Sequence, residues 1–323
     1  MRKRNVSAAP RILVVGYNAY DVVVPVMEFP APDQKAEVPR MITGGGGPGA
    51  TAAVALSRLG ARVKLMTPLT DDLCGRVQRQ ELLAAGVDLS LSPVAAGRAS
   101  PQAVILVDEK RAHRTIFWTR GDVPHLPAQL ADPELLDECD LLYTDGHEPE
   151  VSLRLARSAR ERDLPVVMDA GSVREGSAAL VACCTDVVSS RVFAPGLTGC
   201  PSAVEALRVL RDMGPVRVAM TFGGEGVLGL EDQRFLPVPA FAVPVRDTTG
   251  AGDAFHAGYA LALARGEGFG ACLEWGCAVA ALKCRDWGGR RGLPVLGEVL
   301  DLLETGPRGS AAALQALLAS SAS

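Results

Sequence analysis

Short apolar runs alternate with amphipathic stretches along most of this chain. Five such runs cover residues 11–16 (RILVVG), 141–145 (LLYTD), 164–169 (LPVVMD), 185–190 (TDVVSS) and 216–224 (VRVAMTFGG). Continuous apolar runs of this length are typical of strands that are buried on both faces of a parallel sheet. The segments between them have helical periodicity. The pattern therefore predicts an α/β fold with a mostly parallel central sheet and helices on both faces.

Two further pairs of short strands interrupt this alternation. Residues 22–26 and 36–42 flank a proline-rich turn, and residues 103–107 and 115–118 flank a polar turn at 108–111. Both patterns predict paired strands, the first pair inserted before the next helix. Helices are predicted at residues 50–59, 72–85, 271–283 and 310–323, with one more short strand at 87–91.

Composition narrows the class of protein. The 323 residues are 48% hydrophobic, which supports a substantial core. Lys and Arg number 33 against 37 Asp and Glu, and both signs are scattered, which argues against nucleic acid or an anionic membrane as a partner. The eight cysteines show no CxxC pair or zinc spacing, and no apolar run is long enough to span a bilayer. We expect a cytoplasmic enzyme that acts on a small molecule.

The most informative stretch is residues 247–258, DTTGAGDAFHAG, which leads into an apolar helical segment. Gly250 and Gly252 allow a tight turn and a close approach of the backbone to a ligand, and the first N–H groups of a helix attract phosphate. Asp253 lies in the same turn and could accept a proton from a hydroxyl group held in front of it. The alternative is that Asp253 only caps the helix.

The complete DTTGAGD string resembles the C-terminal signature of the ribokinase-like (PfkB) family of sugar kinases. The resemblance implies that Asp253 is the catalytic base and that Gly250, Ala251 and Gly252 form an anion hole. It also implies a ribokinase-like fold of one domain over residues 1–323, with a discontinuous β-sheet lid from about 21–43 and 98–120.

A second stretch, residues 46–63 (GGPGATAAVALSRLGARV), is similar to the N-terminal signature of the same family. The resemblance implies that Gly46 and Gly47 contact the sugar and that Asp21 hydrogen-bonds to its hydroxyls. Thr51 stands where an Asn is usual. That departure puts the identity of the sugar in question more than the fold.

The same resemblance also implies which residues bind the nucleotide. Residues 221–226 (TFGGEG) resemble the TxGxxG loop of the family, so Thr221, Gly223 and Gly226 are expected beside the ATP phosphates. Thr248 in the central motif and Ala280 in the helix at 271–283 are assigned to the same nucleotide site.

The resemblance also implies Mg²⁺, but the metal ligands remain unknown. Many family members carry an NxxE motif, and this chain has Ser190 and Phe193 at the matching positions. Magnesium would then be held mainly by ATP. A monovalent cation is a further option.

Other functions compete with the kinase. Gly44, Gly46 and Gly49 satisfy GxGxxG, and Asp71 or Asp72 follows at the distance of a ribose-binding acid, which would indicate a nicotinamide-dependent dehydrogenase. That motif normally follows the first buried strand directly, and here it does not. A non-catalytic sugar sensor would be expected to lose Asp253 or the glycine turn. A nucleoside is the rival substrate on the same scaffold.

The amino-acid sequences of these motifs are most similar to those of the ketohexokinase and sulfofructose kinase branch of the family. The lid region carries Lys35, Arg98, Arg111, Arg114 and Arg120. In that branch the resemblance assigns Lys35 to an anionic sugar substituent. Residues 143–147 contain no Arg, and a carboxylate in that segment would repel an anion. We therefore expect a neutral ketohexose as the better substrate and an anionic sugar as the second choice.

Assembly is the last expectation from the sequence. Lid strands that are separate from the main core would expose apolar side chains, and two lids could bury them against each other in a homodimer. The side chains expected there are Val22, Val24, Ile105 and Phe117.

Overall fold

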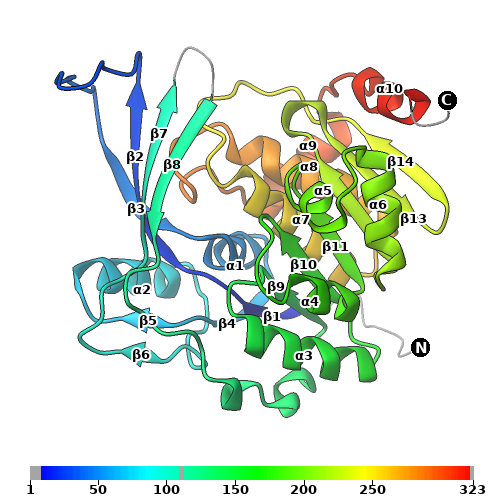
Figure 1. The fold of residues 1–323 in the computed structure, drawn as a ribbon, viewed down its shortest axis with the longest axis horizontal. Helices are drawn as coiled ribbons and strands as arrows, with labels where there is room; N and C mark the ends of the chain where they lie inside the picture. Colours follow the sequence, from blue (N-terminus) through cyan, green and yellow to red (C-terminus); the bar gives the residue numbers. More distant parts are fainter. Residues whose placement is uncertain (1–8, 109–112, 321–323) are drawn as a thin grey trace.

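The computed structural model describes residues 9–108 and 113–320 (Figure 1). Its centre is an eight-stranded sheet in the order β14-β13-β12-β11-β10-β9-β1-β4. The strands from β4 to β12 are parallel, and β13 and β14 continue the sheet in antiparallel pairing. The bounds are β1 (Arg11–Val15), β4 (Arg62–Met66), β9 (Leu141–Thr144), β10 (Val166–Ala170), β11 (Asp186–Ser189), β12 (Arg217–Thr221), β13 (Val227–Glu231) and β14 (Arg234–Val238).

Two hydrophobic cores cover the two faces of this sheet, which confirms the predicted α/β fold with helices on both sides. One core contains α1 (Pro48–Arg58), α7 (Ala251–Ala264), α8 (Phe269–Lys283) and α9 (Leu296–Thr305). The other contains α3 (Pro149–Glu161), α4 (Ser177–Cys183), α5 (Phe193–Thr198), α6 (Ala203–Asp212) and α10 (Ala312–Ser320). Nearly every residue of α7 is buried, because this helix is apolar on all sides. Within the described residues no helix is long and apolar enough to cross a membrane.

A separate four-stranded sheet stands over one end of the main sheet (Figure 1), and we call it the lid. Its order is β3-β2-β7-β8, with β2 and β7 parallel and the other pairs antiparallel. The bounds are β2 (Ala19–Val26), β3 (Ile42–Gly46), β7 (Gln102–Asp108) and β8 (His113–Thr119). Beside it lie α2 (Leu73–Ala84) and the short strands β5 (Leu69–Thr70) and β6 (Val94–Ala95).

Two predicted strands are wrong. The strand predicted at 36–42 lies instead at Ile42–Gly46, because Gly44, Gly45 and Gly46 pair with β2. Residues 87–91 form no strand, although Asp88 makes an isolated bridge to Lys64. Glycine has no side chain to contribute to a hydrophobic pattern, so periodicity could not locate β3.

The register of the lid strands decides which side chains face the main sheet. Asp21, Ala103 and Trp118 are aligned across β2, β7 and β8, so they share one face. Ile105 lies on that face and is 3% exposed in a small core with Val23, and Val24 is 7% exposed, so the expectation that Ile105 and Val24 are exposed is wrong. Phe117, on the opposite face, is 62% exposed.

A buried carboxylate joins the strand ends where the chain order reverses. In parallel α/β sheets this switch point, here between β1 and β9, is where ligands bind. Asp145, just after β9, accepts hydrogen bonds from the backbone N–H groups of Tyr17 at 2.7 Å, Gly49 at 2.8 Å and His147 at 2.9 Å. One side chain thus fixes the end of β1, the start of α1 and the loop after β9.

We expect Asp145→Ala to lower the free energy of unfolding by about 3 to 5 kcal/mol, because it leaves three amide donors without their charged acceptor. Urea unfolding followed by circular dichroism measures this loss. The exposed Asp301→Ala on α9 serves as the control and should stay within about 0.5 kcal/mol of wild type. Equal stability of the two variants would contradict the role of Asp145.

Candidate functional site

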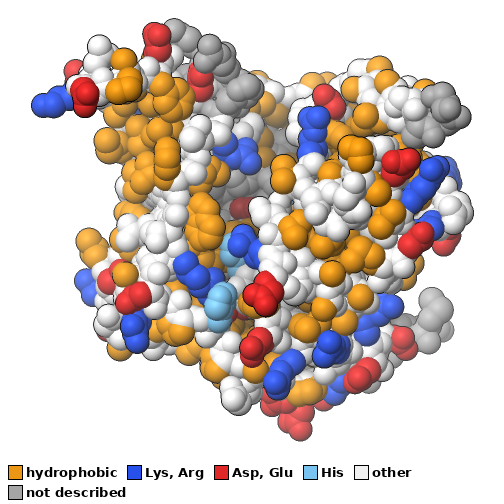
Figure 2. All heavy atoms as spheres, viewed as in Figure 1, with side chains coloured by type: hydrophobic (Ala, Val, Ile, Leu, Met, Phe, Trp, Pro, Cys, Tyr) orange, Lys and Arg blue, Asp and Glu red, His pale blue; other side chains and the backbone are white. Residues whose placement is uncertain are grey.

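A hollow between the lid and the main body is visible in the space-filling view, and Lys, Arg and His side chains gather along its rim (Figure 2). The helix α7 begins there at Gly250, whose φ of 75° suits glycine. A Cβ on Gly250 would lie 2.6 Å from the carbonyl oxygen of Gly289, whereas a Cβ on Gly252 would meet no atom within 4 Å. The turn is therefore packed against Gly289 at Gly250 and is open at Gly252, which leaves room for a ligand beside Gly252.

Asp253 lies in the first turn of α7 and is half-buried. The pKa of its carboxyl group is raised to about 7, first by burial and second by the nearby Asp169, while His256 and Arg114 oppose the shift. A carboxyl group that titrates near neutral pH can accept a proton and release it again. Asp253 thus has the proton affinity of a general base.

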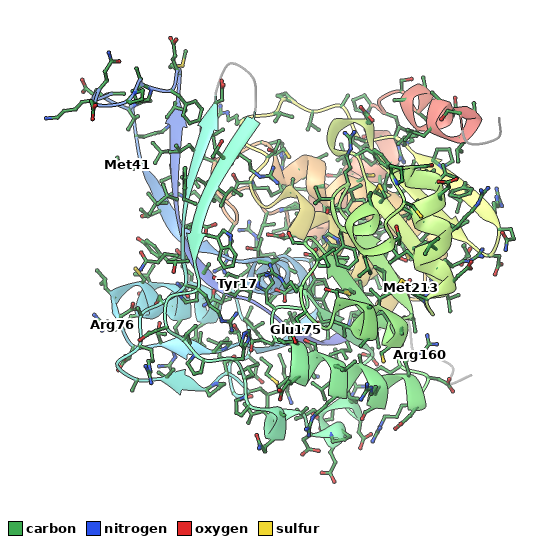
Figure 3. The ribbon with its side chains drawn as sticks, viewed as in Figure 1. Tyr17, Met41, Arg76, Arg160, Glu175 and Met213 are labelled. Carbon is green, nitrogen blue, oxygen red and sulfur yellow. The ribbon has the colours of Figure 1, made fainter. Side chains whose placement is uncertain are left out.

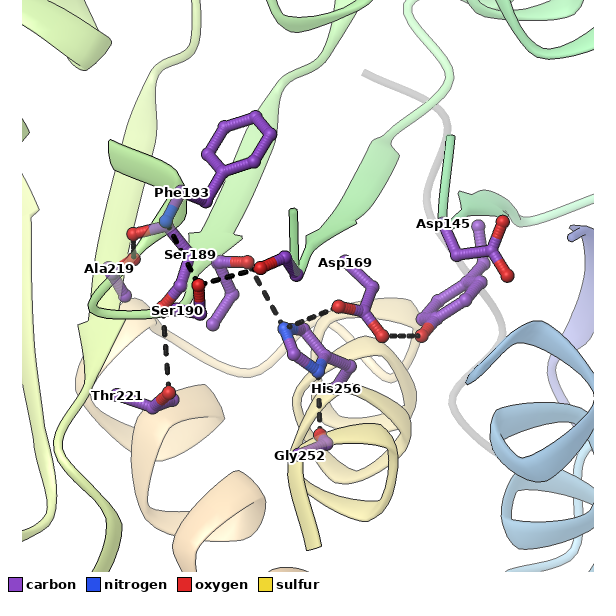
Figure 4. A network of polar contacts seen from close by, with 12 residues as sticks. Asp145, Asp169, Ser189, Ser190, Phe193, Ala219, Thr221, Gly252 and His256 are labelled. Carbon is purple, nitrogen blue, oxygen red and sulfur yellow. Dashed lines mark hydrogen bonds and ion pairs between the residues drawn. The ribbon is translucent and has the colours of Figure 1, made fainter. Parts of the chain in front are cut away.

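His256, one turn further along α7, connects this turn to the main sheet (Figure 4). Its Nδ1 lies 2.6 Å from the carbonyl oxygen of Gly252, and its Nε2 lies 3.1 Å from that of Val188 in β11. Its Nε2 is also 3.4 Å from a carboxylate oxygen of Asp169, which accepts a second contact from the Tyr143 hydroxyl at 3.2 Å. These contacts hold the first turn of α7 against β11 and β10. Sequence analysis did not single out His256.

Asp21 faces the hollow from the inner face of the lid and is 8% exposed. Burial raises the pKa of its carboxyl group to about 7, and Arg290 opposes this shift. Gly46 lies against this carboxyl group so closely that any Cβ at Gly46 would collide with it. Gly47 caps α1 with a φ of 82°, again a glycine conformation.

The structure brings most of the predicted substrate and catalytic residues to one place. Thr51 is fully buried in α1, and its hydroxyl has no hydrogen-bond partner within the described part of the chain. A Cβ on Gly289 would lie 3.8 Å from both Asp21 Oδ2 and Thr51 Oγ1, and Gly289 also packs on Gly250. The Asp21 and Thr51 side chains and the glycine turn of α7 therefore converge around Gly289.

Lys35 does not join this group. It is exposed on the segment between β2 and β3, which Figure 1 shows at the end of the lid remote from β1. Arg111, another lid cation of the sequence analysis, lies outside the described residues. Arg114 reaches the central motif, since its guanidinium donates to the Thr248 hydroxyl at 3.1 Å.

The predicted nucleotide residues lie at the end of β12 and on α8. Thr221 ends β12, and Gly223 and Gly226 follow with φ values of 59° and 112°. Thr221 Oγ1 lies 3.5 Å from the Ser189 carbonyl oxygen, and Ala280 is half-buried on α8. Of these residues Figure 4 labels Thr221, whose hydroxyl points to Ser189 at the end of β11.

No metal ligands come from the Ser190 and Phe193 positions. Phe193 is fully buried in the core. The Ser190 hydroxyl donates to the Gly171 carbonyl at 2.8 Å and accepts at 3.0 Å from the N–H of Phe193, the first residue of α5. Over residues 9–108 and 113–320 no cluster of three or more His, Cys, Asp or Glu could hold a metal ion.

The last residue of α8 and the loop after it carry buried cations that sequence reasoning did not single out. Arg290 is 8% exposed and donates to the Gly46 carbonyl at 2.6 Å and to Asn18 Oδ1 at 3.2 Å. Lys283 is fully buried, and its ammonium group donates to the carbonyls of Asp247 at 3.1 Å and Asp286 at 3.3 Å. The loop therefore ties the glycine strand β3 to the turn before α7. Cations within a glycine-rich loop, GGRRG, were the available signal.

The dinucleotide interpretation does not fit this arrangement. Gly44 and Gly46 lie in the lid strand β3 and not in the first strand-to-helix turn of the main sheet. The acids assigned to the ribose have structural partners instead. Asp71 accepts from the Gly97 N–H at 2.8 Å, and Asp72 caps α2 by accepting from the Gly75 N–H at 2.7 Å.

Comparisons with known proteins agree with the geometry. A family model described as pfkB family carbohydrate kinase matches residues 9–296. The chain is 26% identical over 294 residues to a nucleoside kinase of Methanothermobacter thermautotrophicus, covering 90% of this chain and 94% of the relative. It is 27% identical to a ribokinase of Haemophilus influenzae (91% of this chain, 98% of the relative) and 27% identical to a ketohexokinase of Mus musculus (85% and 96%).

The fold also matches solved structures. The structure of Arabidopsis thaliana ribokinase complexed with ribose and ATP superposes with a TM-score of 0.78 at 22% identity, covering 92% of this chain and 100% of that one. At that identity the likeness shows the fold, which is ribokinase-like.

We expect Asp169→Asn to lower the pKa of the Asp253 carboxyl group from about 7, because it removes a buried like charge that favours the protonated form. Carbon-13 NMR of aspartate-labelled protein follows this titration, with Asp253→Asn identifying the signal. The exposed Asp212→Asn is the control and should leave the titration unchanged. An unchanged Asp253 titration in Asp169→Asn would mean that burial alone sets its pKa.

Proposed function

Because the chain belongs to the pfkB family of carbohydrate kinases, we propose that it transfers the γ-phosphoryl group of ATP to a primary hydroxyl of a small sugar of the ketohexose type. The observation that carries this proposal is Asp253, with a pKa raised to about 7, in an open glycine turn opposite Asp21. The similarity to a mouse ketohexokinase supports the sugar class.

In the proposed reaction Asp21, Gly46, Gly47 and Thr51 hold the sugar. Asp253 accepts the proton of the hydroxyl as its oxygen attacks the γ-phosphorus, and the bond from that phosphorus to the bridging oxygen breaks to release ADP. The turn at Gly250 and Gly252 offsets the charge on the transferred group. The Ala251 amide donates to the Thr248 carbonyl at 3.1 Å, so it would have to release that bond to join the anion hole.

Thr221, Gly223, Gly226, Thr248 and Ala280 are proposed to border ATP. Magnesium would arrive with the ATP phosphates and supply charge neutralisation there. The buried Lys283 ammonium adds a fixed positive charge behind the turn that contains Thr248. We place this reaction in the cytoplasm.

A nucleoside is the second candidate substrate, favoured by the similarity to a nucleoside kinase over 94% of that relative. A phosphorylation panel of ketoses, aldoses and nucleosides with ATP and magnesium separates the two. Turnover of nucleosides alone would replace the sugar in this proposal.

Replacing Asp253 with Asn should lower kcat by roughly two to four orders of magnitude, the usual worth of a positioned general base. Folding and ATP binding should persist, because Asn has the same shape and the nucleotide residues are untouched. Steady-state kinetics and calorimetric ATP titration measure both effects. Turnover within threefold of wild type would remove Asp253 from the mechanism.

We also propose a homodimer formed through the outer face of the lid. Val104 and Phe117 are paired on that face and are 42% and 62% exposed. Apolar side chains gathered on one face are a common site of association.

Light scattering at micromolar concentration should give twice the 33.8 kDa chain mass, and Phe117→Lys should halve it by placing a charge in the contact. Val216→Lys, at an exposed position of the main body, should leave the dimer intact. A mass of one chain for the wild type would refute the dimer.

A further inference from the structure

A lysine is buried beneath the turn that leads into α7. Lys283 is the last residue of α8, which packs along α7, and its side chain is fully buried. Most cations of the described chain lie nearer the surface, as Arg76 on α2 and Arg160 on α3 do in Figure 3. A lysine is almost never fully buried unless its charge is paired, because the ammonium group loses its hydration. The structure must therefore supply partners for this charge.

Two backbone carbonyl groups accept hydrogen bonds from the Lys283 ammonium group. One belongs to Asp247, at the start of the segment that turns into α7, and lies 3.1 Å away. The other belongs to Asp286, in the loop after α8, and lies 3.3 Å away. The ammonium group therefore joins two segments that are distant in the sequence, and we call this contact the junction.

The carboxylate of Asp247 joins the same two segments a second time. It accepts hydrogen bonds from the N–H and hydroxyl groups of Thr249, at 2.8 and 2.7 Å, and from the N–H of Gly288 at 2.7 Å. Burial lowers the pKa of the Lys283 ammonium group, and the carboxylates of Asp247 and Asp253 oppose that shift. Two carbonyl acceptors also favour the charged form, which has three N–H donors. The junction thus favours the ammonium form of Lys283.

The junction supports the glycine turn at the start of α7. Gly250 packs on the loop so closely that a Cβ there would lie 2.6 Å from the Gly289 carbonyl oxygen. Gly289 directly follows Gly288, which Asp247 holds. The Asp247 carboxylate also holds Thr249, the residue before Gly250. Both supports of the turn that presents Asp253 therefore meet at the junction.

Backbone carbonyl oxygens that converge on one buried point are also the ligands that proteins use for K⁺ and Na⁺. Here the ammonium group of Lys283 takes the point where the Asp247 and Asp286 carbonyls converge. A free cation at that point would be in contact with a fixed charge of the same sign and would be repelled by it. The monovalent cation that the sequence left as an option therefore does not fit at the junction.

We propose that Lys283 is a positioning residue that supplies a built-in monovalent cation, so that the activity of this protein needs no added K⁺, Na⁺ or NH₄⁺. This rests on the proposed kinase function. The ammonium group holds the Asp247 and Asp286 carbonyls together, and the glycine turn keeps the shape in which it presents Asp253. Because the charge is attached to α8, it stays in place whatever salt surrounds the protein.

The first test uses the wild-type chain with ATP, magnesium and the substrate that the phosphorylation panel identifies. Turnover and the melting temperature are measured in chloride salts of K⁺, Na⁺, NH₄⁺ and choline at equal ionic strength, and choline is the reference because it is too large for the junction. We expect kcat to vary by less than about twofold among the four salts, since the fixed charge already fills the site. A larger rise with K⁺, Na⁺ or NH₄⁺ would overturn the proposal and leave the kinase function standing.

Replacing Lys283 with Ala removes the ammonium group and leaves space beside the two carbonyls. In choline chloride this variant should lose about tenfold or more in kcat, which corresponds to ~1.4 kcal/mol of transition-state stabilisation. K⁺ or NH₄⁺ should raise its kcat by about fivefold or more, because a free cation can bind the vacated carbonyls. Its melting temperature should also rise with K⁺ concentration, because a ligand that binds only the folded chain stabilises it. A variant that gains neither activity nor stability from these cations would overturn the proposal.

Two matched variants separate the charge from the packing. Lys283→Met keeps an unbranched side chain of similar length without its charge, so it should lose kcat as Lys283→Ala does. K⁺ should not restore it, because the side chain fills the space. Lys64→Ala removes an ammonium group that pairs with Glu138 at the surface, and it should behave as the wild type in all four salts. Wild-type turnover in Lys283→Met would show that packing is sufficient and would overturn the proposal.

The kinase function and the role of Lys283 fail in different ways. If the wild type phosphorylates no sugar or nucleoside of the panel, the proposed function fails, and the melting temperatures judge Lys283 separately. Greater stabilisation of Lys283→Ala than of the wild type by K⁺ or NH₄⁺ supports the built-in cation, and an equal response of the two chains refutes it. If Lys283→Ala folds in none of the four salts, a free cation cannot replace the ammonium group, and the proposal fails as well.

Discussion

The geometry of this protein depends on a single buried carboxylate at the reversal of strand order. Asp145 gathers the N–H groups of Tyr17, Gly49 and His147 and so connects the first strand, the first helix and the third parallel strand of the sheet. Each amide would otherwise be a buried donor that needs a partner. Because the same residue accepts hydrogen bonds from the backbone of Tyr17 and His147, it also positions the stacked pair that these two rings form.

Three carboxyl groups of the candidate site have a raised pKa because they are buried. The pKa values of Asp21, Asp169 and Asp253 are raised to about 7, with desolvation as the first cause in each case. Below about pH 4 both the folded and unfolded forms of these groups hold their protons, so the shifts cost no stability there. As the pH rises toward 7 the unfolded chain releases protons that the folded chain retains, and the contribution of these groups to stability falls. Burial thus gives these carboxyl groups a pKa near neutral pH, and it lowers the free energy of unfolding at pH values above about 4.

The last residue of α8 and the loop after it link the turn before α7 to the lid strand β3. Lys283 holds the turn before α7 through the Asp247 carbonyl, and Gly288 donates to the Asp247 carboxylate at 2.7 Å. Seven residues after Lys283, Arg290 holds β3 through the Gly46 carbonyl. One short segment of the chain therefore contacts both the lid strand β3 and the turn before α7.

The sequence by itself determined the parallel sheet, most helices and the motif around Asp253, because buried strands and a helix start leave local patterns of apolar residues and glycines. It misplaced β3, since Gly44 and Gly46 carry no side chain to reveal a strand, and it put Ile105 on the outer face of the lid. Only the tertiary structure decided the register of the lid and the partners of Asp145 and Arg290. Asp145 meets Tyr17 across 128 residues and Arg290 meets Gly46 across 244. The reason is physical: such contacts depend on how distant strands and loops pack in space, and no local periodicity along the chain encodes them.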